Sequence, residues 1–434
     1  MPLLPRRSTG RKSGPEAAVR TTVVVLFCAW FVDYADRLLI NYVLPDLGDE
    51  FGLSHASQGL VVSAFFVAYA ASQIPGGLLA DRFGARPVVL GALIAWSVFT
   101  GFTALAWSFG SLLVIRFVFG LAQGVFPAAS MKALAERTPA DARMTANGRV
   151  MSSNATAALA VPLLAAPVIA GLGWRWSFAC AAVLGVLVLG LLGRGLRPVD
   201  TAPDKAPQET KEAAGASAVR GMVRQPAVWM FATMMFGYNV IMWGLLTWVP
   251  SYLKEEAGLN LTTVGLLMAV PAAASVAGTL LGGRWSDRLG GQHQRIMLPA
   301  MAVGAACLIL MAFVPGLVAF VVLATVAVLA ISLTYMPIYA VPMRALPREH
   351  TGTGTGIITF GGQVAGMVAP PVLGLLADTL SFRTAFAFLS VGAVIAVLAA
   401  LRTPRDTPSF LAALRPAAPA PHPAAATTLE TETS

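Results

Sequence analysis

Twelve long apolar runs constrain the fold of this chain more than any other feature. Each is about 18 or more residues long, the length that an α-helix needs to cross a bilayer. Only helices and closed barrels satisfy all backbone polar groups in lipid, so the runs predict an all-α membrane protein. The composition agrees, because only 12% of the 434 residues are charged. The runs cover residues 21–44, 57–80, 87–107, 111–131, 148–170, 176–196, 226–251, 261–283, 296–314, 317–342, 354–377 and 384–402.

Polar stretches divide these runs into two equal sets. The segment 197–225 separates six runs from six, which predicts a six-helix bundle over 21–196, a central cytoplasmic loop, and a second six-helix bundle over 226–402. We expect residues 1–20 to form a basic cytoplasmic tail. We expect residues 403–434 to form a disordered tail, because they are rich in Ala, Pro and Thr.

The basic residues gather on one side of the predicted topology. If the N-terminus is inside, 25 of the 30 Lys and Arg residues lie in inner loops and tails. Arg175, Lys254 and Arg383 lie outside, and Arg37 and Arg116 lie within the membrane. Cytoplasmic loops of membrane proteins carry an excess of Lys and Arg, so this distribution predicts that both termini are cytoplasmic. Topology thus explains the net charge of +9, and we expect no nucleic-acid partner.

Nothing in the sequence predicts catalysis or a cofactor. The three cysteines and four histidines show no metal or redox spacing, and there is no P-loop and no nucleophile elbow. We therefore expect no enzyme, no metal and no cofactor. The first apolar run is too long for a signal peptide and has no small-residue cleavage site, so we interpret the N-terminus as retained.

The first apolar run carries Asp33, Asp36 and Arg37 near its middle. A charged side chain at mid-bilayer costs about 2.5–3.5 kcal/mol on insertion scales, so such groups normally face a protein or water interior. Asp33 and Arg37 are helical neighbours, and a second membrane cation, Arg116, offers another guanidinium fork for anionic oxygens. We interpret these residues as the core of a translocation site. Alternatively, Arg37 merely neutralises the carboxylates and Arg116 snorkels to an interface.

An internal repeat supports the division into two halves. GGLLADRFGARP (76–87) recurs as GGRWSDRLGGQH (282–293), in each case at the inner end of the second run of its half. Two related halves with a site between them are the plan of many secondary transporters. The candidate conformational residues are Gly77, Asp81, Arg82 and Gly84 in the first copy, with Asp287 and Arg288 in the second.

These motifs resemble those of major facilitator superfamily transporters, and more closely those of the anion:cation symporter family, across residues from about 20 to 402. The resemblance is carried by YADR (34–37), SQIPGGLLADRFGAR (72–86), RFVFGLAQGVFPA (116–128), GWRWSFA (173–179) and TWVPSYL (247–253). It implies two six-helix bundles in a bacterial inner membrane. It also implies import of a small organic anion (a carboxylate, sugar acid or sulfonate) with protons or another cation, and it places Arg37 and Arg116 in the anion site.

Gln123 departs from this family pattern, because many members have Glu at its position. Gln cannot titrate, so Asp36 is the best remaining proton carrier and Asp33 the next. A carboxylate beside Arg37 would hold the guanidinium when ionised and release it to the substrate when protonated. The departure leaves open an exchanger or exporter that is not coupled to protons. A more remote alternative is a ligand sensor that transports nothing.

Other polar residues within the apolar runs are candidate substrate contacts, although each could instead hydrogen-bond between helices. In the second half, Tyr238, Tyr335, Tyr339 and Thr359 have suitable spacing. We expect a monomer whose partners are the organic anion, a co-transported proton or other cation, and the lipid bilayer. Besides the two arginines, the candidate substrate-binding residues are Tyr34, Tyr69, Gln123, Asn154, Asn239 and Gln363.

Overall fold

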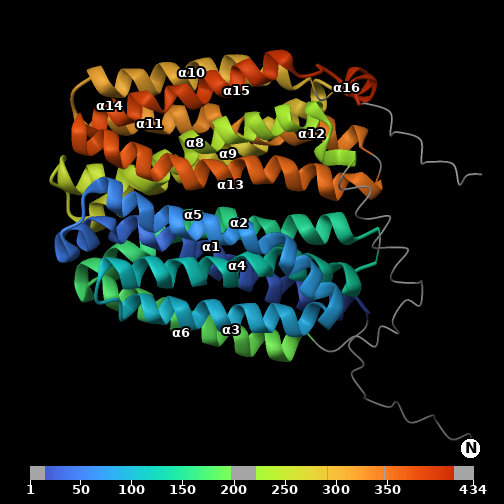
Figure 1. Cartoon of the computed structure of the whole chain (residues 1–434), viewed down its shortest axis with the longest axis horizontal. Helices are drawn as coiled ribbons and strands as arrows, with labels where there is room; N and C mark the ends of the chain where they lie inside the picture. The colour runs from blue at the N-terminus through green and yellow to red at the C-terminus, as the bar shows by residue number, and fades with distance from the viewer. Residues whose placement is uncertain (1–14, 140, 197–220, 291, 347, 415–434) are drawn as a thin grey trace, which may run out of the picture.

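The computed structural model describes residues 15–139, 141–196, 221–290, 292–346 and 348–414, and all the regular elements in them are helices (Figure 1). The first half contains α1 (Pro15–Phe51), α2 (His55–Phe83), α3 (Ala85–Ala104), α4 (Phe109–Arg137), α5 (Arg143–Leu172) and α6 (Trp174–Gly195). The second half contains α8 (Pro226–Glu255), α9 (Leu261–Arg288), α10 (His293–Phe313), α11 (Leu317–Ser332), α12 (Tyr335–Ala345), α13 (Arg348–Thr379), α14 (Phe382–Phe388), α15 (Ser390–Arg402) and α16 (Thr407–Ala413). Most of the predicted central loop and the outer parts of both tails lie outside the described residues.

The described chain has eleven helical segments that are long and apolar enough to cross a membrane. This confirms an all-helical, multi-pass membrane protein. α1 is the longest helix, with 37 residues, but it is not among the eleven. Its apolar run contains Asp33, Asp36 and Arg37. The count of twelve spans and the cytoplasmic position of both termini therefore stay predictions.

Two apolar runs do not form single continuous helices. The run 317–342 is divided between α11 and α12, because Pro337 has no N–H to offer the carbonyl of residue 333 and so disfavours an uninterrupted helix. The run 384–402 is divided between α14 and α15 at Leu389. In both cases the two helices belong to one predicted apolar run. The divisions therefore raise the number of helices and do not change the predicted order of the runs.

The tail after residue 403 is more ordered than predicted, since residues 407–413 form α16. The Asp406 carboxylate caps this helix by accepting a hydrogen bond from Ser409 N at 2.9 Å. Phe410 is fully buried, and its ring centroid lies 5.6 Å from that of Phe231 on α8. Burial of the Phe410 ring thus orders this part of a segment whose Ala, Pro and Thr content predicted disorder.

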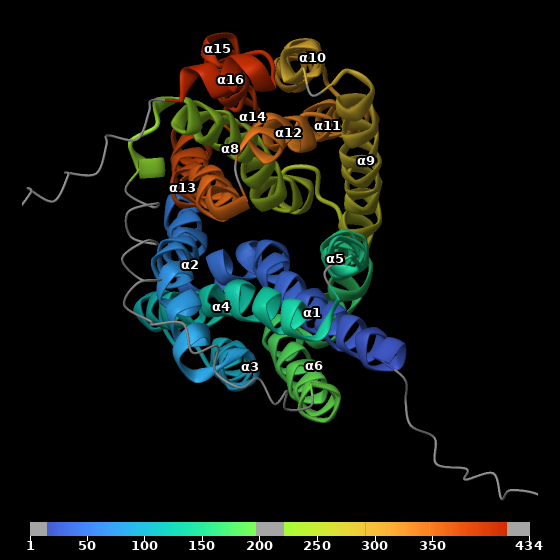
Figure 2. The same cartoon turned by 90° about the vertical axis from the view of Figure 1, so that its right-hand side faces the viewer.

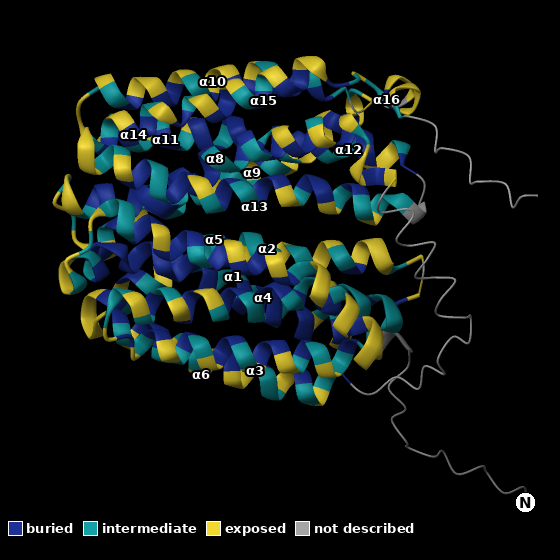
Figure 3. Ribbon diagram, in the orientation of Figure 1, coloured by how far each residue is buried: buried dark blue, intermediate teal, exposed yellow. Residues whose placement is uncertain are grey.

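The helices gather into two groups, α1–α6 and α8–α15, which lie against each other (Figure 2). Across the boundary between the groups, α2 packs against α13, α5 against α9, and α1 against α8. The outer helices display large apolar side chains such as Leu187 on α6 and Val318 on α11, whereas buried residues concentrate on the inward faces (Figure 3). An apolar exterior of this extent is what lipid contact requires.

Candidate functional site

α1 carries the three predicted charged residues into the interior of the first half. Asp33, Asp36 and Arg37 have relative exposures of 0%, 2% and 9%. Arg37 Nη2 donates to Asp33 Oδ2 at 3.1 Å, which is the helical pair expected from the spacing. The Asp36 carboxylate has a different partner, because Thr100 Oγ1 on α3 donates to its Oδ2 at 3.1 Å. The two carboxylates therefore have separate environments.

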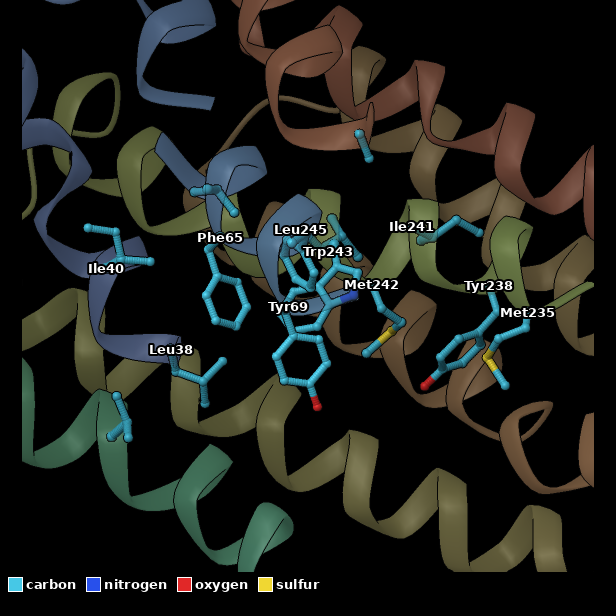
Figure 4. Close-up of a cluster of buried hydrophobic side chains, with 14 of the residues drawn as sticks. Leu38, Ile40, Phe65, Tyr69, Met235, Tyr238, Ile241, Met242, Trp243 and Leu245 are labelled. Carbon is cyan, nitrogen blue, oxygen red and sulfur yellow. The ribbon is translucent and has the colours of Figure 1, made fainter. Parts of the chain in front are cut away.

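Aromatic rings surround the guanidinium of Arg37. Its Cζ lies 4.4 Å from the ring centroid of Tyr69, 5.2 Å from that of Phe65 and 5.8 Å from that of Tyr34. Figure 4 shows Phe65 and Tyr69 in a buried cluster that also contains Trp243 of the second half. Cation–π contacts stabilise a desolvated guanidinium without using its hydrogen-bond donors. Arg37 Nε has no hydrogen-bond partner, so a donor remains for a ligand.

Arg116 on α4 is 2% exposed, which contradicts the alternative that it snorkels to an interface. Its guanidinium lies near the rings of Phe119 and Phe178, at 5.0 and 5.6 Å, and within electrostatic reach of Asp36. Neither its Nε nor its Nη2 has a hydrogen-bond partner. Buried polar groups are rarely left unpaired, so these two donors call for an acceptor.

The two arginines line one small cavity at the boundary between the halves. Asn41 and Phe66 contribute to it from the first half, and Trp243 from the second. Asn41 Oδ1 also has no hydrogen-bond partner. The structure thus brings together both predicted cations, with unpaired polar atoms, where the two groups of helices meet.

Gln123 is fully buried and its amide connects α4 to α1. Its Nε2 donates to the backbone oxygen of Asp33 at 2.9 Å. This contact gives Gln123 a positioning role at the charged segment of α1.

The remaining amide candidates lie on three other helices. Asn154 on α5, Asn239 on α8 and Gln363 on α13 are all half-buried. Asn239 Nδ2 donates to Met235 O at 3.0 Å, while Asn154 Oδ1 and Gln363 Oε1 have no hydrogen-bond partner. No hydrogen bond between these amides and Arg37 occurs within the described residues. Tyr34 and Tyr69 therefore contact the Arg37 guanidinium and Arg116 shares a cavity with it, whereas the three amides lie on other helices and make no hydrogen bond to Arg37.

The repeated motif makes the same contact in each half. Lys132 Nζ on α4 lies 2.7 Å from Asp81 Oδ1, and Arg344 Nη2 on α12 lies 2.6 Å from Asp287 Oδ1. Both basic partners were overlooked in the sequence, although each follows its acidic residue by about fifty positions. The conformational residues Gly77, Arg82, Gly84 and Arg288 occupy the same two helix ends, where Gly84 has a φ of +87°.

The ion pairs that join the two halves in the described residues lie at the end of the molecule where α1 ends and α2 begins. His55 Nδ1 lies 2.7 Å from Asp378 Oδ1 on α13, and its Nε2 lies 2.8 Å from Glu255 Oε2 on α8. Lys254 on α8 forms an ion pair with Asp46 on α1. We call this set of residues the clasp.

The backbone at the start of α2 is part of the clasp. Both Asp378 oxygens accept from it, Oδ1 from His55 N and Oδ2 from Ala56 N, each at 2.9 Å. A Cβ on Gly374 would clash with His55 O, so glycine permits this approach of α13. Sequence reasoning missed the clasp, because its partners are up to 323 positions apart and looked like ordinary helix-end charges.

A second polar cluster at the same end lies wholly within the first half. Glu50 Oε2, beyond the apolar run of α1, accepts from Trp174 Nε1 at 2.8 Å and from Arg175 Nη1 at 2.6 Å. The hydrogen bond from Arg175 holds the pKa of Glu50 below its usual range. Arg175 Nη2 also donates to Ala106 O at 3.0 Å. This cluster therefore stabilises one half and does not join the two.

Comparison with known proteins agrees with this architecture. The model of the Major Facilitator Superfamily matches residues 26–370 and 295–429. The chain is 33% identical over 398 residues to the probable sulfoacetate transporter SauU of Cupriavidus necator, which covers 85% of this chain and 91% of that protein. It is 29% identical over 401 residues to the hexuronate transporter of Bacillus subtilis, which covers 88% and 93% of the two chains.

Solved structures show the same fold. A bacterial homolog of the human lysosomal transporter Spinster, in an inward-facing and unoccupied conformation, superposes with a TM-score of 0.79 at 18% identity. The superposition covers 95% of this chain and 100% of that one. The family match and the names of the relatives indicate a transporter and not an enzyme. The chain belongs to the Major Facilitator Superfamily, and within it resembles the anion:cation symporters that carry organic acids.

Proposed function

We propose that this protein imports a small organic anion across a bacterial inner membrane by proton symport with alternating access. It would act as a monomer with twelve spans and two cytoplasmic termini. The two six-helix bundles, residues 21–196 and 226–402, would rock against each other about a site at their boundary.

The observation that carries the proposal is the pair of buried guanidinium groups of Arg37 and Arg116. They line one cavity of about 10 Å³, which would have to widen as the halves move in order to admit a cargo. Both guanidinium groups are buried and retain unpaired N–H donors, and both line the same space between the halves. A carboxylate or sulfonate would supply the missing acceptors with charge-assisted hydrogen bonds. The printed functions of the relatives, sulfoacetate and hexuronate transport, are consistent with a cargo of this class.

Asp36 is the proposed proton carrier. It is 2% exposed, it is held by a neutral hydroxyl from Thr100, and Arg116 is its nearby cation. When Asp36 is ionised it competes with the substrate for Arg116, and when protonated it leaves that guanidinium to the anion. Asp33 is the second candidate, although it already holds Arg37.

The clasp suggests the direction of opening. Under the predicted topology, the end where α1 meets α2 is extracellular. The conformation is then the one that is sealed toward the outside. Rupture of the clasp would accompany the change to the conformation that admits substrate.

The direct test is uptake into liposomes that contain the purified protein. An inward-directed proton gradient should drive uptake of labelled organic anions from a panel of carboxylates and sulfonates. Arg37→Gln should abolish this uptake, whereas Arg194→Gln, which removes an exposed cation at the end of α6, should leave it intact. Substantial uptake by the Arg37 variant would refute the assigned role.

An exchanger or exporter without proton coupling is the second candidate. The observation that favours it is the neutral Gln123, which donates to the α1 backbone and cannot exchange a proton. Counterflow of labelled anion at equal pH on both sides, together with no response to a pH gradient, would support exchange over symport.

A further inference from the structure

We infer that the second half carries a specific binding site for one anionic phospholipid, in a groove on its outer surface formed by α9, α10 and α11. The phosphate of the lipid would bind Arg288 and Arg295, and one acyl chain would lie along the groove. The site belongs to the second half alone. It is distinct from the cavity of Arg37 and Arg116 and does not depend on what the protein transports.

The groove is a cavity of about 480 Å³ between three helices. α11 packs against both α9 and α10, and it lies between them at the outer edge of the second half (Figure 2). The walls of the groove are apolar side chains, among them Ile296 and Val303 of α10 and Val326 of α11. Val303 and Val326 are 47% and 38% exposed, so the groove opens on the apolar exterior of the protein.

Two arginines lie at one end of this groove. Arg288 is the last residue of α9 and Arg295 lies in the first turn of α10, and both line the cavity with exposed side chains. Neither guanidinium forms a hydrogen bond or an ion pair in the part of the chain that the structure describes. The adjacent acid, Asp287, is instead paired with Arg344 on α12 at 2.6 Å. Two unpaired cations beside an apolar groove require a ligand with a negative charge on an apolar body.

The cations lie at the depth of phospholipid headgroups. Under the predicted topology, α9 ends and α10 begins on the cytoplasmic side of the membrane. Trp285 of α9 also lines the cavity and is 43% exposed, and tryptophan is enriched at headgroup level because its ring is amphipathic. From Arg295 to Val303 an α-helix rises about 12 Å. The groove therefore runs from the headgroup region into the hydrocarbon region.

A phospholipid with a net negative charge satisfies both parts of the groove. A guanidinium fork binds phosphate oxygens bidentately, and one phosphate has oxygens for both arginines. Basic pockets between membrane helices on the cytoplasmic side suit anionic headgroups. A zwitterionic headgroup would bring its own cation toward the two arginines. A soluble phosphate would use the arginines and leave the apolar walls without a partner.

Three probes separate these possibilities. Dioleoylphosphatidylglycerol is anionic, dioleoylphosphatidylcholine has the same chains with a zwitterionic headgroup, and glycerol 1-phosphate has the phosphate without chains. Binding is measured by native mass spectrometry of the full-length protein in a neutral detergent. One phosphatidylglycerol should bind about tenfold or more tightly than phosphatidylcholine, because charge-assisted hydrogen bonds are added to the same apolar contact. Glycerol 1-phosphate should not displace it.

Variants of the arginines test the headgroup site. Arg288→Gln combined with Arg295→Gln should weaken phosphatidylglycerol about tenfold, since the charge-assisted bonds are lost at a partly exposed site, and should leave phosphatidylcholine unchanged. The charge-matched control is Arg284→Gln combined with Arg405→Gln. Both of these arginines are exposed at the same end of the second half and do not line the groove. The control should bind phosphatidylglycerol as the parent does.

A second pair of variants tests the acyl-chain site. Val303→Trp fills the groove and keeps both arginines, so it should weaken phosphatidylglycerol. Val394→Trp on α15 is the matched control, because Val394 is 54% exposed on the apolar exterior and does not line the groove. The melting temperature of each variant in detergent without lipid should equal the parental value, which separates loss of binding from loss of fold.

The inference is overturned if phosphatidylcholine binds the parent protein as tightly as phosphatidylglycerol, since this surface would then take any bilayer lipid. It is also overturned if glycerol 1-phosphate competes, since the occupant would then be a soluble phosphate. Equal weakening by the two pairs of arginine substitutions would indicate general surface charge and overturn it as well. Parental binding in Val303→Trp would remove the acyl chain from the groove, with the same consequence. The comparison of the three probes on the parent protein needs no variant, so it decides the inference even if a variant does not fold.

Discussion

Asp378 offers a quantitative test of how the two halves separate. Its carboxylate accepts from His55 N and Ala56 N at 2.9 Å and contacts His55 Nδ1 at 2.7 Å. It therefore caps the N-terminus of α2 from another helix. Loss of a capping side chain costs about 0.5–2 kcal/mol, and the third hydrogen bond adds about 1 kcal/mol at this partly exposed site. Asp378→Asn keeps the shape and one acceptor. It places an amide NH2 where a carboxylate oxygen accepted a hydrogen bond and removes the negative charge beside His55, so we expect the clasp to weaken by about 2 kcal/mol, the value of one hydrogen bond to a charged group.

A change of about 2 kcal/mol shifts the balance between the two conformations about thirtyfold toward separation at this end. The shift is measured as a distance distribution between spin labels on a cysteine-free background. Asp49 at the end of α1 and Glu256 after α8 are both exposed and flank the clasp. The parent protein should give one short distance, and the Asp378 variant should add a longer population.

The matched control is Glu50→Gln at the same end. This substitution also removes the charge of a carboxylate that accepts two hydrogen bonds. Both donors, Trp174 and Arg175, belong to the first half. This variant should keep the short distance. A parental distribution in Asp378→Asn, or an equal shift in Glu50→Gln, would refute the assignment of the clasp as the contact that holds the halves together.

Two further predictions follow from contacts in the first half. Asp36→Asn should abolish uptake driven by a pH gradient and preserve counterflow, because the anion site remains and the proton carrier is lost; gradient-driven uptake by this variant would assign the proton elsewhere. Gly76→Ala should lower the thermal unfolding temperature, since the added Cβ would lie 2.6 Å from Val125 Cα on α4 and overpacking costs about 1–3 kcal/mol. Gly77→Ala is its control, because its nearest neighbour would be at 3.8 Å; equal effects of the two substitutions would contradict the packing argument.

Local periodicity predicted some of the site and tertiary packing determined the rest. The pair of Asp33 with Arg37 follows from their four-residue separation and is present at 3.1 Å. The bond from Thr100 to Asp36 spans 64 positions. It had no signal in the sequence, because a threonine in an apolar helix usually bonds its own backbone. Thr100 Oγ1 also lies 3.0 Å from Trp96 O, so its single proton is shared between that carbonyl and the Asp36 carboxylate.

The same distinction applies to the fold. Run lengths and the repeated glycine motif predicted the order of helices, because the bilayer imposes both length and hydropathy on each segment. They could not predict the short helix α16, whose docking depends on one ring, Phe410, against a surface formed by other helices. Nor could they predict the clasp, since its residues lie at helix ends where polar side chains are expected in any case.

The four buried charges give a physical reason for coupling in a carrier of this kind. With both carboxylates ionised, the charges of Asp33, Asp36, Arg37 and Arg116 sum to zero. A bound monoanion leaves the enclosed site with one negative charge, and an uncompensated charge in a low-dielectric interior costs several kcal/mol. A proton on Asp36 restores neutrality, so closure around anion and proton together is favoured over closure around the anion alone. Because Gln123 in α4 carries no charge, one proton is enough to neutralise a site that holds a monoanion. A site that holds a dianion and one proton would keep one negative charge. The requirement that the loaded site be neutral would then couple transport of the anion to transport of the proton. The same requirement would favour a cargo with a single negative charge.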